Sequence, residues 1–210
     1  MAALRRLLRP RGVRRGRDDA GYTLIELAAA MGVFTIVLAV FINTLRIMAS
    51  TTSRVYATTT AAADGRQALD VLSRQLGFAS AANLPVRSGQ NWYLEFESDA
   101  VKAGSDPLCT QWRYQNSTGR LQYRTWSTVT LTGSSWTTTA RSMANDPTTQ
   151  PPFTVLASDA GFKVMRVSAD LRLSTSVGAI MQSQGQFTLR NSIDAPVPTA
   201  STVCTQLGRP

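Results

Sequence analysis

The sequence predicts an α+β fold, in which one long N-terminal helix packs on a small antiparallel β-sheet domain. Three observations predict it: an uncharged apolar run near the N-terminus, helical spacing of apolar residues as far as residue 82, and alternating residues after Pro85. The 210 residues, 43% of them hydrophobic, are enough for one modest domain and one additional terminal segment.

Residues 1–21 are expected to be a basic leader peptide that is removed on maturation. They contain seven arginines and only two acidic residues, Asp18 and Asp19, and so hold most of the net charge of +9. Basic residues just before an apolar run normally keep that end of a membrane protein in the cytoplasm. We therefore expect a topology signal here, rather than an arm that binds nucleic acid.

Residues 22–45 are the expected membrane half of the helix. No charged residue occurs from Leu27 to Leu45, and this run would be about 28 Å long as a helix, close to the hydrocarbon thickness of a bilayer. A buried core helix is the alternative, but a chain of this size has too small a core to surround it. The leader predicts a single-pass protein of the cytoplasmic membrane, with its N-terminus inside and its C-terminal domain extracytoplasmic.

The stretch GYTLIE, residues 21–26, stands between the leader and the apolar run. A secretory signal peptide is cut after its apolar region, whereas the small residue here precedes that region. The stretch resembles the prepilin cleavage and methylation motif of type IV pilins and type II secretion pseudopilins. The resemblance implies that a prepilin peptidase cuts after Gly21, that Tyr22 becomes the N-methylated first residue, and that Glu26 is the fifth mature residue. It also implies other pilins or pseudopilins, an assembly platform in the cytoplasmic membrane and membrane lipid as partners.

Glu26 is the only charged residue within residues 22–45. An acidic residue at the centre of a membrane helix costs about 2.5 to 3.5 kcal/mol, and less near the interface. The helix macrodipole offsets about 0.3 to 1 kcal/mol. A cation beside Glu26, such as a free α-amino group on Tyr22, adds an attraction of about 4 kcal/mol at an effective dielectric constant of about 20. The resemblance implies that this amine belongs to a neighbouring subunit and that Glu26 acts in assembly; the dipole alone is the alternative.

Residues 46–82 are the expected amphipathic half of the helix. Pro85 is the expected stop, with Gly77 as an earlier alternative. The Ser/Thr-rich residues 50–60 weaken helix propensity and could break the helix, and Gly65 could soften it. Apolar or small residues recur at helical spacing: Met48, Val55, Ala62, Leu69, Leu72, Leu76 and Ala79.

Residues 83–210 are expected to form an antiparallel, β-rich extracytoplasmic domain with Pro/Ser/Thr-rich loops. Turn-forming residues 116–119 predict a hairpin, and residues 161–174 and 185–193 predict two later strands. Residues 127–152 predict a weak strand set in long loops. The end of the helix, the hairpin and the late LRNS together resemble minor pilins and pseudopilins of the PilW or J-type group.

The stretch NWYLEFES, residues 91–98, has the alternation of a half-buried strand. It places Trp92, Leu94 and Phe96 on one face, and Glu95 and Glu97 on the other. Two carboxylates on one strand face can serve glycoside chemistry, but charged residues on a solvated face are far commoner. We expect Glu95 and Glu97 to be solvated.

Cys109 and Cys204 are the only cysteines, and both fall in the domain expected outside the cytoplasm. That environment favours oxidation, so we expect one disulfide between them. Two free thiols are the alternative.

Neither a catalytic residue nor a metal or cofactor site is predicted, so we do not expect an enzyme. The chain has no histidine, which removes the Ser-His-Asp and Cys-His arrangements. No glycine-rich phosphate loop and no Cys or Asp cluster with metal-ligand spacing occurs in the sequence.

The expected function is therefore a structural subunit, a minor pilin or pseudopilin, of a type IV pilus or type II secretion-like filament. The alternative is a single-pass, signal-anchored surface protein whose outer domain binds a ligand or DNA, as in adhesion or competence. Aromatic and basic residues alternate in a way that would suit nucleic acid if they shared one surface, although alternation favours tryptophans in the core. These residues are Trp92, Trp112, Trp126, Trp136, Arg113, Arg120 and Arg124.

Overall fold

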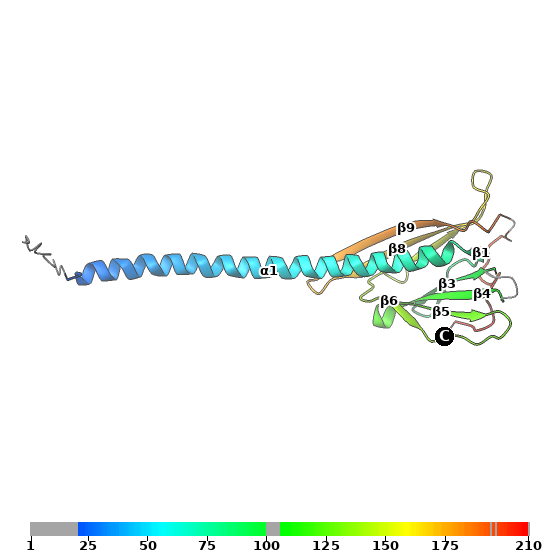
Figure 1. Cartoon of the computed structure of the whole chain (residues 1–210), viewed down its shortest axis with the longest axis horizontal. Helices are drawn as coiled ribbons and strands as arrows, with labels where there is room; N and C mark the ends of the chain where they lie inside the picture. The colour runs from blue at the N-terminus through cyan, green and yellow to red at the C-terminus, as the bar shows by residue number, and fades with distance from the viewer. Residues whose placement is uncertain (1–20, 100–105, 194, 196, 210) are drawn as a thin grey trace, which may run out of the picture. The chain divides into compact units, whose positions relative to one another are not determined.

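The computed structural model describes residues 21–99, 106–193, 195 and 197–209, and it confirms the α+β arrangement (Figure 1). The chain divides into two compact units, residues 1–49 and 50–210. The expected leader lies outside the described residues except for Gly21. The described elements are α1 (Leu24–Leu76), β1 (Ala79–Ala82), β2 (Val86–Ser88), β3 (Asn91–Ser98), β4 (Leu108–Gln115), the 3-10 turn η1 (Asn116–Thr118), β5 (Arg120–Ser127), β6 (Thr137–Ala140), β7 (Phe153–Leu156), β8 (Arg166–Ser174) and β9 (Ile180–Thr188).

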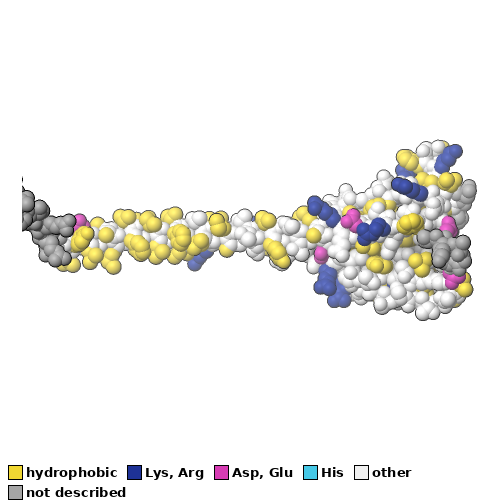
Figure 2. Space-filling model, viewed as in Figure 1, with side chains coloured by type: hydrophobic (Ala, Val, Ile, Leu, Met, Phe, Trp, Pro, Cys, Tyr) yellow, Lys and Arg dark blue, Asp and Glu magenta, His cyan; other side chains and the backbone are white. Residues whose placement is uncertain are grey.

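In the first unit, the helix exposes apolar side chains all round. Its large apolar residues from Leu24 to Met48 are exposed (Figure 2). The hydroxyls of Thr35 and Thr44 donate to carbonyls one turn earlier, so these polar groups are satisfied within the helix. The helix is long and apolar enough to cross a membrane. Apolar surface on this scale needs a cover, which lipid or other apolar helices can supply.

In the second unit, α1 buries a stripe of small residues that ends in two leucines. The stripe differs from the predicted one, because Met48 and Val55 are exposed while Ala62 and Leu69 are only half-buried. At Gly65 the reason is a close approach of β8 and β9 to the helix, because a Cβ at this position would meet Leu173 and Ser183. The buried residues are Ala57, Ala61, Gly65, Ala68, Leu72 and Leu76.

The helix continues without a break through residues 50–60 and ends earlier than residue 82. The end lies at Leu76, beside the earlier of the two predicted stops, where the amide of Gly77 donates to the carbonyl of Ser73 at 3.0 Å. Residues 79–82, expected to be helical, form β1 instead. Pairing with β3 buries Ala79 and Ala82 completely, which outweighs the high helix propensity of alanine.

Sheet A has six strands in the order β1-β3-β4-β5-β6, with β2 also paired to β3. The predicted hairpin is confirmed, because β4 and β5 pair along their full length around η1. Gly119 completes this turn with φ of 59°, in the region that favours glycine. β1 and β2 were not predicted, because strands of four and three residues carry too little alternation to be recognised.

Sheet B has three strands in the order β7-β8-β9. β8 lies within the predicted residues 161–174, but β9 begins before the predicted strand at 185–193 and ends before it. The side chains of β9 alternate between exposed and half-buried, and its exposed positions include three glutamines. Its half-buried positions include Ser183 and Gly185, so the apolar alternation that marks a strand is weak in this sequence.

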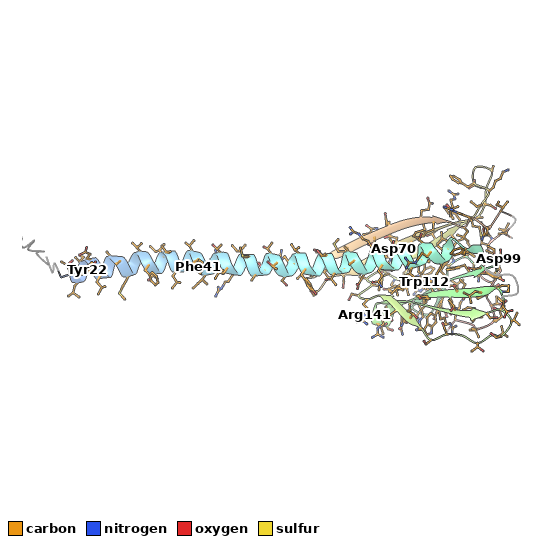
Figure 3. The ribbon with its side chains drawn as sticks, viewed as in Figure 1. Tyr22, Phe41, Asp70, Asp99, Trp112 and Arg141 are labelled. Carbon is orange, nitrogen blue, oxygen red and sulfur yellow. A yellow bond between two sulfur atoms is a disulfide. The ribbon has the colours of Figure 1, made fainter. Side chains whose placement is uncertain are left out.

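One core joins α1 and both sheets in the second unit, where α1 lies between β8 and β9 on one side and sheet A on the other (Figure 1). Trp112 of sheet A is fully buried there (Figure 3). Its indole nitrogen donates to the side-chain oxygen of Gln75 in α1 at 2.7 Å, and its ring stacks on Tyr123 at 5.3 Å. The loop after β6 ties the sheets together, because Met143 bonds to Gly119 of the hairpin and forms a bridge with Leu173 of β8.

Replacing Gly65 by valine is expected to lower the free energy of unfolding by about 1 to 3 kcal/mol, the usual cost of overpacking. A Cβ at this position would clash with the hydroxyl of Ser183 in β9 and would lie 3.0 Å from the Cβ of Ser183. Chemical denaturation measures the change. Ala63→Val, on the exposed side of the same helix turn, should cost only the small loss of helix propensity. Equal effects of the two substitutions would contradict the close packing.

Candidate processing and assembly site

The predicted processing residues lie directly before α1. Gly21, Tyr22 and Thr23 have no regular secondary structure, and Tyr22 is 85% exposed (Figure 3). Exposed chain without secondary structure is the form in which a peptidase can bind its substrate. The Gly21–Tyr22 bond is therefore accessible.

Thr23 caps the N-terminus of α1. Its hydroxyl accepts a hydrogen bond from the amide of Glu26 at 3.3 Å, and its carbonyl accepts from the amides of Glu26 and Leu27 at 3.0 and 3.1 Å. The spacing T-x-x-E of Thr23 and Glu26 is that of a capping box. The residues that follow the predicted cleavage position thus also start the helix.

Glu26 lies in the first turn of α1, where the helix macrodipole favours a carboxylate. It is exposed, and no basic side chain of the described residues lies within salt-bridge distance of its carboxylate. Water solvates the carboxylate in the isolated chain, but this solvation would be lost in an apolar environment. The described part of the chain supplies no cation to replace it.

Cys109 and Cys204 form a disulfide, with their Cα atoms 5.6 Å apart. Cys109 lies on β4, and Cys204 lies in the C-terminal segment. Both are buried in a small cluster with Trp126, Val203 and Leu207. The structure therefore brings this predicted pair together, across a sequence separation of 95 residues.

The environment of Glu95 corrects a prediction. Glu95 was expected to be solvated but is only 2% exposed. Its carboxylate accepts hydrogen bonds from Asn83 and Gln111, both at 2.7 Å, and two from Arg209 at 2.6 and 3.0 Å. Alternation assigned Glu95 to the correct face of β3, but the C-terminal segment covers that face. Four donors fix the carboxylate, as in a structural ion pair.

Glu97, on the same face, is half-buried. Burial raises the pKa of its carboxyl group, and the negative charge of Asp99 raises it further. Within the described segments, no group of three or more His, Cys, Asp or Glu side chains could hold a metal ion.

The four tryptophans do not share one surface. Trp92 and Trp112 contact the core between the sheets and α1, whereas Trp126 packs beside the disulfide on the opposite face of sheet A. The nucleic-acid surface considered from the sequence is therefore divided between two faces. Two of its aromatic residues serve the core, as alternation predicted.

Trp136 contacts two arginines on the face of sheet A that carries Trp126 and the disulfide, here called the second face. The guanidinium of Arg113 lies 4.0 Å from the centre of its ring, and that of Arg124 lies 4.7 Å from it. Burial lowers the pKa of Arg124, and the neighbouring charge of Arg113 lowers it further. The ring thus helps to hold two like charges close together.

No pattern in the sequence indicates the partners of Glu95. Arg209 is 114 residues away along the chain, and its position near the C-terminus carries no periodicity that could be recognised. Asn83 lies in a short connection between β1 and β2. Only the path of the folded chain brings these residues to β3.

Comparison with known proteins gives one match. Residues 16–42 match the family model of the prokaryotic N-terminal methylation motif. No curated protein and no solved structure matches the chain. The match covers the predicted cleavage position, Tyr22, Glu26 and most of the uncharged run. The chain therefore carries a type IV pilin-like prepilin motif, and the apolar helix that follows this motif fits a membrane-anchored protein.

Proposed function

We propose that this protein is a non-catalytic structural subunit of a type IV pilus or type II secretion-like filament, as a minor pilin or pseudopilin. The observation that carries the proposal is the methylation motif at the start of an apolar helix that buries none of its first 33 residues. A helix of this kind is stable only inside a lipid bilayer or among other apolar helices. A filament subunit encounters both environments in turn.

The proposed route begins in the cytoplasmic membrane. The arginine-rich leader holds the N-terminus inside, and the domain of residues 50–210 lies outside the cytoplasm. The disulfide between Cys109 and Cys204 supports this placement of the domain, because such bonds persist in oxidising surroundings.

Processing would then expose a new charge. Hydrolysis of the Gly21–Tyr22 bond by a prepilin peptidase leaves an α-amino group on Tyr22, four residues before Glu26. In the filament, the amine of one subunit would pair with Glu26 of its neighbour. The lack of a basic partner for Glu26 among the described residues supports this role.

Mass spectrometry of the protein from its native membrane tests the proposal. We expect the mature chain to begin at Tyr22 and to carry one methyl group on its amino nitrogen. A Gly21→Leu variant should keep its leader, because the residue at the cleavage position is altered. A wild-type chain that still begins at Met1, or that begins after residue 45, would contradict the proposal and favour a signal-anchored surface protein.

A further inference from the structure

The C-terminal residues 197–209, here called the strap, run across the second face of sheet A. The strap has no helix or strand of its own. It is held by contacts with the sheet and its neighbouring connection. The amide of Leu84 donates to the carbonyl of Thr199 at 2.8 Å, and Asn83 exchanges two hydrogen bonds with the backbone of Val203 at 2.7 and 2.8 Å.

The disulfide is the first of two links, here called locks, that hold the strap on sheet A. Cys109 is fully buried on β4, and Cys204 belongs to the strap. Val203 and Leu207 of the strap pack around the disulfide and Trp126. Cys109 is therefore shielded from solvent by the segment to which it is bonded.

The ion pair of Glu95 and Arg209 is the second lock. Glu95, Gln111 and Arg124 are neighbours across β3, β4 and β5, and they form one hydrogen-bonded row. The strap closes over this row, because the carbonyl of Gly208 accepts bonds from Gln111 at 2.9 Å and from Arg124 at 3.1 Å. The charged row thus depends on the strap to complete its hydrogen bonds.

The strap does not pack tightly against the sheet everywhere. A pocket of about 270 Å³, open to solvent on one side, lies beside Glu95 and is otherwise lined by strap residues: Ser201, Cys204, Thr205, Gly208 and Arg209. The polar row beneath can also be solvated by water when it is uncovered, because its members carry charges and amides. Sheet B and α1 belong to the main core cluster, which contains no residue of the strap, whereas Val203, Cys204 and Leu207 belong to the small cluster around Trp126. Removal of the strap therefore leaves the main core intact.

We infer that the strap is a redox-operated cover over the second face of sheet A. When the residues after Cys204 open transiently, a dithiol reaches the Cys109–Cys204 bond, donates two electrons and two protons to it, becomes a disulfide itself, and leaves two thiols on the protein. The Glu95–Arg209 pair then becomes the remaining lock, and its release uncovers the row of Glu95, Gln111 and Arg124. With the disulfide intact, release of the ion pair frees only the residues after Cys204.

The rate at which Cys109 is alkylated by a maleimide tests this inference, because the thiol is reached only when the strap is open. The mature full chain in detergent carries Cys204→Ser, which leaves Cys109 as its single thiol. We expect that adding Arg209→Gln to this variant raises the alkylation rate at least about ten-fold. Arg190→Gln, which alters an exposed arginine outside the strap, is the matched control and should leave the rate unchanged.

Hydrogen exchange separates opening of the strap from unfolding of the domain. In the Cys204→Ser and Arg209→Gln variant, amides of residues 197–209 should exchange faster, while those of β8 keep their protection. Reduction of the wild-type chain by dithiothreitol should also speed exchange in residues 197–209. An alkylation rate that Arg209→Gln does not change would overturn the inference. So would faster exchange in β8 to the same degree as in the strap, because the variant would then unfold as a whole.

Discussion

Replacing Glu26 by alanine is expected to reduce incorporation of the protein into filaments at least about ten-fold, which corresponds to a loss of about 1.4 kcal/mol per subunit. The substitution removes the only charge within residues 22–45, so insertion into the membrane should become easier, not harder. Cleavage after Gly21 should continue, because that bond lies outside the helix and is exposed. The expected defect is therefore confined to assembly.

The size of the effect follows from electrostatics in a partly dry site. An amine and a carboxylate about 4 Å apart attract each other by about 4 kcal/mol at an effective dielectric constant of about 20, before desolvation is subtracted. The helix macrodipole contributes about 0.3 to 1 kcal/mol and acts on the isolated subunit as well. The pairing between subunits, rather than the dipole, should therefore decide incorporation.

The measurement compares the amount of each variant in purified filaments with its amount in the membrane. Glu26→Gln keeps the shape but not the charge, and it should fail in the same way as Glu26→Ala. Asp70→Ala, which removes an exposed acidic residue later in α1, is the matched control and should assemble normally. If Glu26→Ala entered filaments as efficiently as the wild type, the pairing role would be wrong.

Replacing Trp112 by alanine should lower the free energy of unfolding of the second unit by about 3 to 5 kcal/mol. Trp112 is fully buried where α1, sheet A and sheet B meet, so its removal leaves a cavity that the two sheets cannot easily close. The change also leaves the side-chain oxygen of Gln75 without its 2.7 Å hydrogen bond and removes the stacking on Tyr123.

Chemical denaturation of a chain that begins at Ser50 can measure this loss, because every buried residue of the described chain lies in the second unit. Trp112→Phe keeps an aromatic ring but loses the indole donor, and it should cost less. Trp136→Ala is the matched control, because Trp136 is half-buried against arginines and should contribute only about 1 to 2 kcal/mol. Equal losses for Trp112→Ala and Trp136→Ala would contradict the position of the core.

The features that the sequence predicts well are local. The hairpin between β4 and β5 depends on turn residues beside alternating strands, and α1 depends on an apolar run and helical spacing. The start of the helix is encoded within four residues, by the cap at Thr23 and the acid at Glu26. Each of these signals lies within one stretch of chain, so no distant residue is needed to read it.

The predictions that failed depend on contacts between distant segments. The buried stripe of α1 is set by how closely β9 approaches Gly65, and residues 79–82, predicted to be helical, form a strand that pairs with β3. The observed helix end at Leu76 agrees with the earlier of the two predicted stops, Gly77. The prediction that Glu95 is solvated is wrong because its partner, Arg209, is 114 residues away along the chain. A β-strand has two faces. Alternation assigns each residue to one face, but it does not show which distant segment covers that face.

The sequence by itself determined the prepilin-type motif, the apolar run that follows it, the acid in the first helical turn and the class of the fold, because charge, hydropathy and motif act over a few neighbouring residues. Only the tertiary structure decided that the C-terminal strap covers sheet A, that Glu95 is buried in an ion pair, and which helix residues form the core. These depend on burial, and burial is a property of the whole folded chain, since a residue leaves water only when distant segments close over it.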